Sequence, residues 1–162
     1  MIIGFDVSSK NIGYGVLDID GNYVDSGVYS PAGNGELEQL SNTEYWVGHT
    51  LARYKIKHVG IEKLIPFMVG KSTSKTIIKL AKFNSIVGVG AFRYGIYPEF
   101  FHVKSIRSIL KDENNKAPKS KEEVYNRINR ILGIEGDETY NDGYDISDGL
   151  AVAYYYFDKL RK

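Results

Sequence analysis

Cysteine is absent from this 162-residue chain, which excludes disulfide bridges and metal sites built on thiolates. Only three histidines are present, and their positions lack the spacing typical of zinc ligands. No apolar run approaches the about 18 residues needed to cross a membrane, and the N-terminus lacks the basic segment and apolar core of a secretory signal. We therefore expect a soluble, cytoplasmic protein that does not engage a membrane.

The residues that are present describe an ordinary globular chain with an uneven charge. Hydrophobic residues make up 43% and charged residues 25%, so we expect one domain covering residues 1–162. The net charge is +1, but residues 55–121 carry +10 whereas the segments before and after them carry −5 and −4. A basic middle segment suits a partner rich in phosphates. A solvated lysine surface explains the same counts equally well.

The spacing of apolar residues changes along the chain from a strand pattern to alternating helices and strands. Three strands joined by short turns open the chain and predict an antiparallel meander. Helical spacing then alternates with two further short strands, which predicts a mixed sheet of five strands with helices on its faces. The expected strands are 2–5, 13–19, 23–29, 58–62 and 100–103. The expected helices are 36–54, one that starts near 72–74 and includes 77–91, 124–132 and 146–159, with a short helical turn at 103–110.

Four acidic residues stand at notable positions in this pattern. Asp6 and Glu62 each end an apolar strand, where an unpaired buried charge is unfavourable. Asp145 and Asp148 are three residues apart and share one face at the start of the last helix. A salt bridge or a helix cap explains each acid singly, and Asp145 is a good N-cap candidate.

Four converging carboxylates are the donor set for hard cations such as Mg²⁺. Two such ions about 3.5–4 Å apart can activate a water and stabilise the leaving 3′ oxygen in phosphodiester cleavage. We therefore predict that Asp6, Glu62, Asp145 and Asp148 are metal ligands and catalytic residues, with two Mg²⁺ ions per site and Mn²⁺ able to substitute.

Three segments of the chain resemble the RuvC-type Holliday-junction resolvases. Residues 3–16 resemble the start of that family, residues 59–62 its second acidic strand, and residues 145–153 its C-terminal acid-x-x-acid helix. The resemblance covers nearly the whole chain. It implies an α/β RNase H-like fold, a homodimer, and a Mg²⁺- or Mn²⁺-dependent endonuclease that nicks four-way DNA junctions, with the same four acids as catalytic groups.

Further residues are expected to contact DNA. By resemblance, Phe67 matches the aromatic residue placed at the junction centre, and Lys104 and Lys121 match phosphate-binding lysines. Helical spacing places Lys71, Lys75 and Lys79, together with Lys82, on one stripe that could follow a phosphate backbone. A loop anchor at Phe67 and a solvated helix face are the alternative explanations.

Some positions depart from the bacterial pattern and leave the substrate detail open. Ser8 stands where glycine is usual, Ile12 where threonine is usual, and Gly149 where alanine is common. These departures suggest a divergent member, such as one encoded by a phage.

Three other functions stay open. The first is an RNase H-like nuclease acting on flaps, other branched DNA or structured RNA. The second is a sugar kinase or chaperone ATPase, which shares the opening hairpin but needs two such domains. The third is a junction-binding protein without catalysis.

Overall fold

A five-stranded mixed sheet forms the centre of the molecule in the computed structural model, which describes residues 1–64, 73–135 and 143–162. Its spatial order is β3-β2-β1-β4-β5. The β1/β2 and β2/β3 pairs are antiparallel, and the β1/β4 and β4/β5 pairs are parallel. The predicted mixed sheet is therefore confirmed. The strands are β1 (Ile2–Val7), β2 (Ile12–Leu17), β3 (Tyr23–Tyr29), β4 (His58–Glu62) and β5 (Glu99–Phe101).

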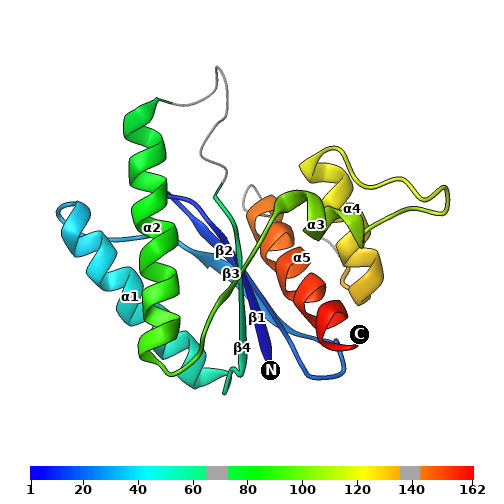
Figure 1. Cartoon of the computed structure of the whole chain (residues 1–162), viewed down its shortest axis with the longest axis horizontal. Helices are drawn as coiled ribbons and strands as arrows, with labels where there is room; N and C mark the ends of the chain where they lie inside the picture. The colour runs from blue at the N-terminus through cyan, green and yellow to red at the C-terminus, as the bar shows by residue number, and fades with distance from the viewer. Residues whose placement is uncertain (65–72, 136–142) are drawn as a thin grey trace.

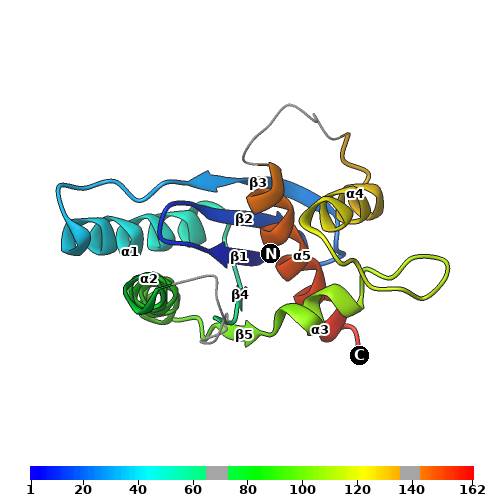
Figure 2. The ribbon, with the colours of Figure 1, turned by 90° about the horizontal axis from the view of Figure 1, so that it is seen from above.

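Helices cover both faces of this sheet, as predicted (Figures 1 and 2). The first two helices lie side by side on one face, and the last helix lies across the other face with two shorter helices beside it. In the part of the chain that the structure describes, no helix is long and apolar enough to span a membrane. The helices are α1 (Glu36–Arg53), α2 (Ser74–Arg93), α3 (Val103–Ser108), α4 (Lys121–Leu132) and α5 (Gly143–Leu160).

The alternation of side chains along β1 decides which helix layer each residue meets. Ile3 and Phe5 are fully buried in the core beneath α1 and α2, whereas Ile2 belongs to the core beneath α5. Gly4 and Asp6 share the α5 side with Ile2. The same period of two that builds the core therefore directs the Asp6 carboxylate toward α5.

Gly4 allows α5 to lie directly on β1. A Cβ atom at this position would come within 2.2 Å of the backbone nitrogen of Ala153 in α5. Such a distance is far shorter than any real contact, so only glycine permits this approach. The close packing fixes the height of α5 above the sheet.

Several element boundaries differ by a few residues from the sequence prediction, and two of these differences bear on the site. The strand predicted over 100–103 ends at Phe101, because the carbonyl of His102 accepts a hydrogen bond from the amide of Ile106 at 3.0 Å and so begins α3. The last helix is already formed at Gly143, earlier than predicted. Asp145 therefore lies inside α5, and the alternative that it caps this helix is wrong.

Candidate active site

Two parallel strands bring Asp6 and Glu62 to the same edge of the sheet. Strand β1 pairs with β4 in a register that places Phe5 opposite Ile61. The next residue of each strand is one of the two acids, so their carboxylates emerge side by side. The side-chain amide of Asn84 in α2 donates to the backbone carbonyl of Glu62 at 3.0 Å and holds the end of β4 in place.

The start of α5 is pressed onto β2 beside these two acids. Gly13 of β2 pairs with Asp6, and a Cβ atom at Gly13 would come within 1.9 Å of the carbonyl oxygen of Asp145. Gly149 of α5 also packs closely against β2, since a Cβ atom at this position would lie 2.7 Å from the Cα of Tyr14. Gly149 thus allows a helix–strand approach that alanine would prevent.

Lys121, the first residue of α4, bridges three of the four acids. Its Nζ lies 2.8 Å from Oδ2 of Asp148, 3.3 Å from Oδ1 of Asp145 and 3.9 Å from Oδ2 of Asp6. The lysine side chain remains 49% exposed, so its ammonium group stands between the acids and solvent. Asn11, just before β2, approaches Asp145 from the other side with its amide nitrogen 3.5 Å from Oδ2.

All four acids line one cleft of about 440 Å³. Residues from six segments meet there: the end of β1, the end of β4, α2, α3, and the starts of α4 and α5. Besides the acids, its lining includes Lys121, Arg107, Asn84, Lys63, Leu80 and Val103.

Burial and mutual repulsion disfavour the ionised acids. Burial raises the pKa of Asp6 to about 8, and the charges of Glu62 and Asp148 act in the same direction. The pKa of Glu62 is raised to about 7 by burial and then by Asp148. Burial also raises the pKa of Asp148, against the hydrogen bond and charge of Lys121. The cluster has more negative charge than its cations balance.

Lys121 is held in its charged form by the acids. Burial alone would lower its pKa, but the hydrogen bond to Asp148 and the charges of Asp148, Asp6 and Asp145 raise it above the ordinary lysine value. As the side chains of the described residues are placed, no three acidic or histidine groups are arranged to hold a single metal ion. Three of the four carboxylates share the Lys121 ammonium instead.

The donor chemistry nevertheless fits a divalent cation. The cluster offers carboxylate oxygens only, which is the set that Mg²⁺ prefers. Burial, and then the neighbouring carboxylates, raise the pKa of Asp6 and Glu62, and a bound cation would favour the ionised form of both.

The residues expected to contact DNA are placed unevenly. Lys121 reaches the acids, whereas exposed Lys104 on α3 does not line the cleft. The charges of Lys79 and Lys75 on α2 help to lower the pKa of Glu36 on α1, after the hydrogen bond and charge of Lys82, and neither Lys79 nor Lys75 lines the cleft. Lys82 is paired with Glu36. Phe67 and Lys71 lie outside the described residues.

Sequence reasoning missed Arg107, one helical turn beyond Lys104. The guanidinium lines the cleft and its charge lowers the pKa of Glu62 and Asp148, so it lies close enough to act on both. No signal in the sequence separates Arg107 from Lys104, because only the packing of α3 places the first in the cleft and leaves the second outside. Asn11 and Asn84 gave no signal of their own.

Comparison with known proteins adds evidence independent of this geometry. The family model described as "Crossover junction endodeoxyribonuclease RuvC" matches residues 2–156. Curated relatives with that same name include one from Nitratiruptor sp., 25% identical over 99% of this chain and 97% of its own length. Another, from Orientia tsutsugamushi, is 26% identical over 95% of this chain and 92% of its own length.

Solved structures show the same fold. Thermus thermophilus RuvC in complex with a Holliday junction substrate has a TM-score of 0.78 at 19% identity, covering 99% of this chain and 96% of that one. The yeast mitochondrial Holliday junction resolvase has a TM-score of 0.62 at 14% identity, covering 96% and 76%. The family model over nearly the whole chain decides the assignment: this chain belongs to the RuvC family of crossover junction endodeoxyribonucleases.

Proposed function

We propose that this protein is a metal-dependent endonuclease that nicks four-way DNA junctions and so resolves branched DNA in recombination. The observation that carries the proposal is the convergence of Asp6, Glu62, Asp145 and Asp148 on one cleft beside Lys121 and Arg107. Family membership supplies the reaction, since the relatives carry the name of crossover junction endodeoxyribonucleases.

The four acids are proposed to hold Mg²⁺, with Mn²⁺ able to replace it and two ions per site. Ions held there would supply an activated water and stabilise the leaving 3′ oxygen. The chain's own contribution is a cluster whose charge repulsion is relieved by cations. The backbone of β1, β4 and α5 presents its carboxylates on rigid elements, which orients them before the substrate arrives.

Lys121 and Arg107 are proposed to contact the DNA backbone next to the cut. Both cations line the acidic cleft, and the Lys121 side chain is half exposed. They place positive charge where the phosphate must approach an otherwise negative site. Lys75, Lys79 and Lys104 lie outside the cleft and stay predicted contacts for more distant parts of a branched substrate.

We further propose that the protein is a homodimer paired through α2. Three apolar side chains on this helix, Ile78, Val89 and Phe92, are 57%, 41% and 53% exposed. Ile78, Ser85 and Phe92 repeat every seven residues, which is the spacing of a helix that packs along a second helix. A two-fold pair of α2 helices would cover this strip and match the two-fold symmetry of a four-way junction.

The proposed function is tested with a panel of labelled substrates, comprising a four-way junction, a flap, a linear duplex and a structured RNA. We expect Mg²⁺-dependent paired nicks in opposing strands of the junction and little cutting of the rest. Asp6→Asn is expected to lower junction cleavage by at least about a thousandfold with junction binding retained, because the acid acts in the chemical step.

Asp158→Asn is the matched control, because Asp158 lies near the far end of α5 and pairs with Lys162 instead. Preferred cutting of flaps or RNA would show a different RNase H-like nuclease. Junction binding without any cutting by the wild type would show a binding protein. Undiminished cleavage by Asp6→Asn would refute the catalytic assignment.

A further inference from the structure

The segment 111–120, between α3 and α4, is held in place mainly by polar contacts. Most of its side chains are exposed, and Pro118 is the one that is fully buried. A segment with so few apolar anchors gains little from burial and depends on hydrogen bonds for a fixed position. It nevertheless leads directly into Lys121, whose side chain must reach the acids.

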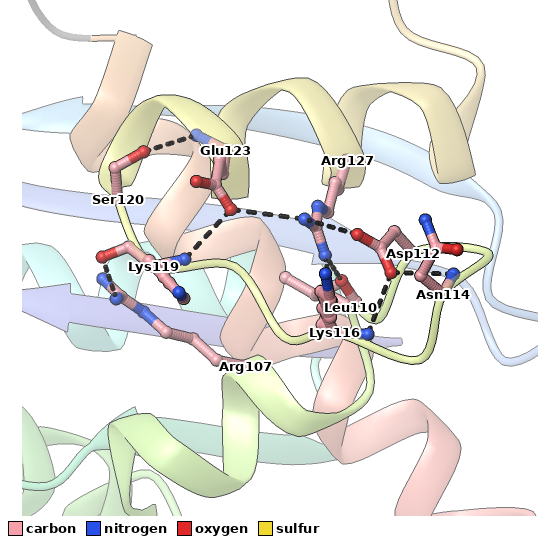
Figure 3. A network of polar contacts seen from close by, with 9 residues as sticks. All are labelled: Arg107, Leu110, Asp112, Asn114, Lys116, Lys119, Ser120, Glu123 and Arg127. Atoms are coloured by element: carbon pink, nitrogen blue, oxygen red, sulfur yellow. Dashed lines mark hydrogen bonds and ion pairs between the residues drawn. The ribbon is translucent and has the colours of Figure 1, made fainter.

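Arg127 of α4 supplies the contacts that close this segment (Figure 3). Its Nη1 donates to the carbonyl oxygen of Leu110 at 2.8 Å and to that of Lys116 at 2.5 Å. Its Nη2 lies 3.5 Å from Oδ2 of Asp112 and 3.2 Å from Oε2 of Glu123. The Arg127 side chain is largely buried. It therefore contacts Leu110 just before the segment, Asp112 and Lys116 within it, and Glu123 in the helix that follows.

Glu123, which contacts Arg127, also binds the two residues just before Lys121. Its carboxylate accepts a hydrogen bond from the amide of Lys119 at 3.1 Å, while its own amide donates to Oγ of Ser120 at 3.1 Å. This pair resembles a capping box and begins α4 at Lys121. From the other side, Arg107 of α3 donates to the carbonyl of Lys119 at 3.2 Å.

We propose that Arg127 is a positioning residue that sets the start of α4, and with it Lys121, against the acidic cluster. The contacts run from Arg127 through Glu123 and the Lys119–Ser120 backbone to Lys121, whose ammonium meets Asp6, Asp145 and Asp148. Arg127 itself does not line the cleft. The inference rests on the proposed function, because it assigns Arg127 to the same reaction.

A purely local role for Arg127 would be to stabilise α4 through its pair with Glu123, four residues earlier. An ion pair between residues four apart on a helix contributes little to stability by itself. It also leaves the contacts with the Leu110 and Lys116 carbonyls unexplained, since neither residue belongs to α4. The guanidinium fork is suited to bind several acceptors at once, which lysine cannot reproduce.

A double-mutant cycle between Arg127 and Lys121 tests the proposal. Single-turnover junction cleavage is measured for Arg127→Gln, Lys121→Ala and the double variant. We expect Arg127→Gln to lower the rate about tenfold and to have no further effect, within about twofold, in the Lys121→Ala background. Arg127→Lys should recover only part of the loss.

Arg130→Gln is the matched control, because Arg130 lies exposed on the same helix and makes none of these contacts with the segment. It should keep the wild-type rate. If Arg127→Gln lowers cleavage by the same factor with and without Lys121, Arg127 does not act through Lys121 and the proposal is wrong.

Amide hydrogen exchange gives a measurement that needs no cleavage. Arg127→Gln should speed exchange at residues 112–121 and leave the strands β1 and β4 unchanged, whereas Arg130→Gln should change neither. Unaltered exchange at 112–121 would overturn the proposal. This measurement decides the matter even if Lys121→Ala cleaves too slowly for the double-mutant cycle to be measured. If Arg127→Gln changes exchange as predicted but the wild type cuts no junction, only the proposed function is refuted.

Discussion

Asp6 lies largely buried beside Glu62, Asp145 and Asp148, with the Lys121 ammonium 3.9 Å from its Oδ2. Its usual pKa of 3.8 is raised to about 8 in the folded chain, by burial and then by Glu62 and Asp148. A carboxylate in this setting is unfavourable for folding and favourable for binding cations. Asp6 therefore couples the stability of the fold to pH and to the binding of a metal ion.

The sign of this linkage predicts how stability depends on pH when divalent cations are removed. The folded state binds the Asp6 proton more tightly than the unfolded state, so stability present below about pH 4 is lost as the pH rises toward about 8. Each unit of pKa shift corresponds to about 1.4 kcal/mol. Between about pH 5 and pH 9 we expect the wild type to lose about 2 kcal/mol or more relative to Asp6→Asn.

Urea unfolding in EDTA at the two pH values measures this difference. Asp158→Asn should have the same free energy of unfolding as the wild type at both pH values. Added Mg²⁺ should raise the melting temperature of the wild type more than that of Asp6→Asn. A wild type that loses no more stability than Asp6→Asn would contradict the electrostatic description of the site.

At the scale of elements, glycines decide how closely α5 approaches the sheet. Gly4 and Gly13 leave room on β1 and β2 for the helix backbone, and Gly149 leaves room on the helix for β2. The contact between α5 and these two strands forms much of the core. Because Asp145 and Asp148 lie on this helix, its height above the sheet also sets their distance from Asp6.

Gly13→Ala is expected to move the acids on α5, Asp145 and Asp148, away from the acids on the strands, Asp6 and Glu62. The added methyl would overlap the carbonyl of Asp145, and the helix must move to relieve it. Overpacking of this kind costs about 1–3 kcal/mol, and a displacement of about 1 Å at a catalytic group costs about a hundredfold in rate. Thermal unfolding and junction cleavage measure the two effects.

Gly48→Ala in α1 is the control of identical chemistry. Its Cβ would meet nothing within 4 Å, and alanine is favoured over glycine within a helix by up to about 1 kcal/mol. We expect unchanged or higher stability and unchanged cleavage. Equal loss of cleavage in both variants would show that the approach of α5 is not what matters.

At the scale of the whole molecule, the two helical layers have different surroundings. The two layers cover opposite faces of the sheet (Figure 2). The α5 layer carries Asp145 and Asp148, whereas Ile78, Val89 and Phe92 of α2 are exposed. Apolar side chains repeated along one helix are typical of a surface that another protein covers. A second copy of this chain is the partner that the proposed reaction requires.

Val89→Asp is expected to convert the dimer to a monomer, because it places a charge at the centre of the proposed α2 pair. Size-exclusion chromatography with light scattering measures the mass, and cleavage should change from paired nicks to slow single nicks. Ile19→Asp replaces a side chain that is 63% exposed on another part of the surface and should leave both unchanged. A wild type that elutes as a monomer would overturn the dimer, and an unchanged Val89→Asp dimer would place its interface elsewhere.

Local patterns in the sequence predicted most of the elements and singled out the four acids. Apolar alternation marked the strands, helical spacing marked the helices, and acids at strand ends and on one helical turn indicated a metal site, because each signal depends on neighbouring residues alone. The motifs at both ends of the chain also led to the correct family, which the match over residues 2–156 established.

Only the tertiary structure decided how these parts face one another. The rotation of α2 turns Lys75 and Lys79 toward α1 and Leu80 and Asn84 toward the cleft, and the packing of α3 brings in Arg107 while leaving Lys104 outside. The bridge from Lys121 to three acids and its support by Arg127 join residues far apart in the chain. Such relations depend on how helices pack on the sheet, which no local spacing specifies.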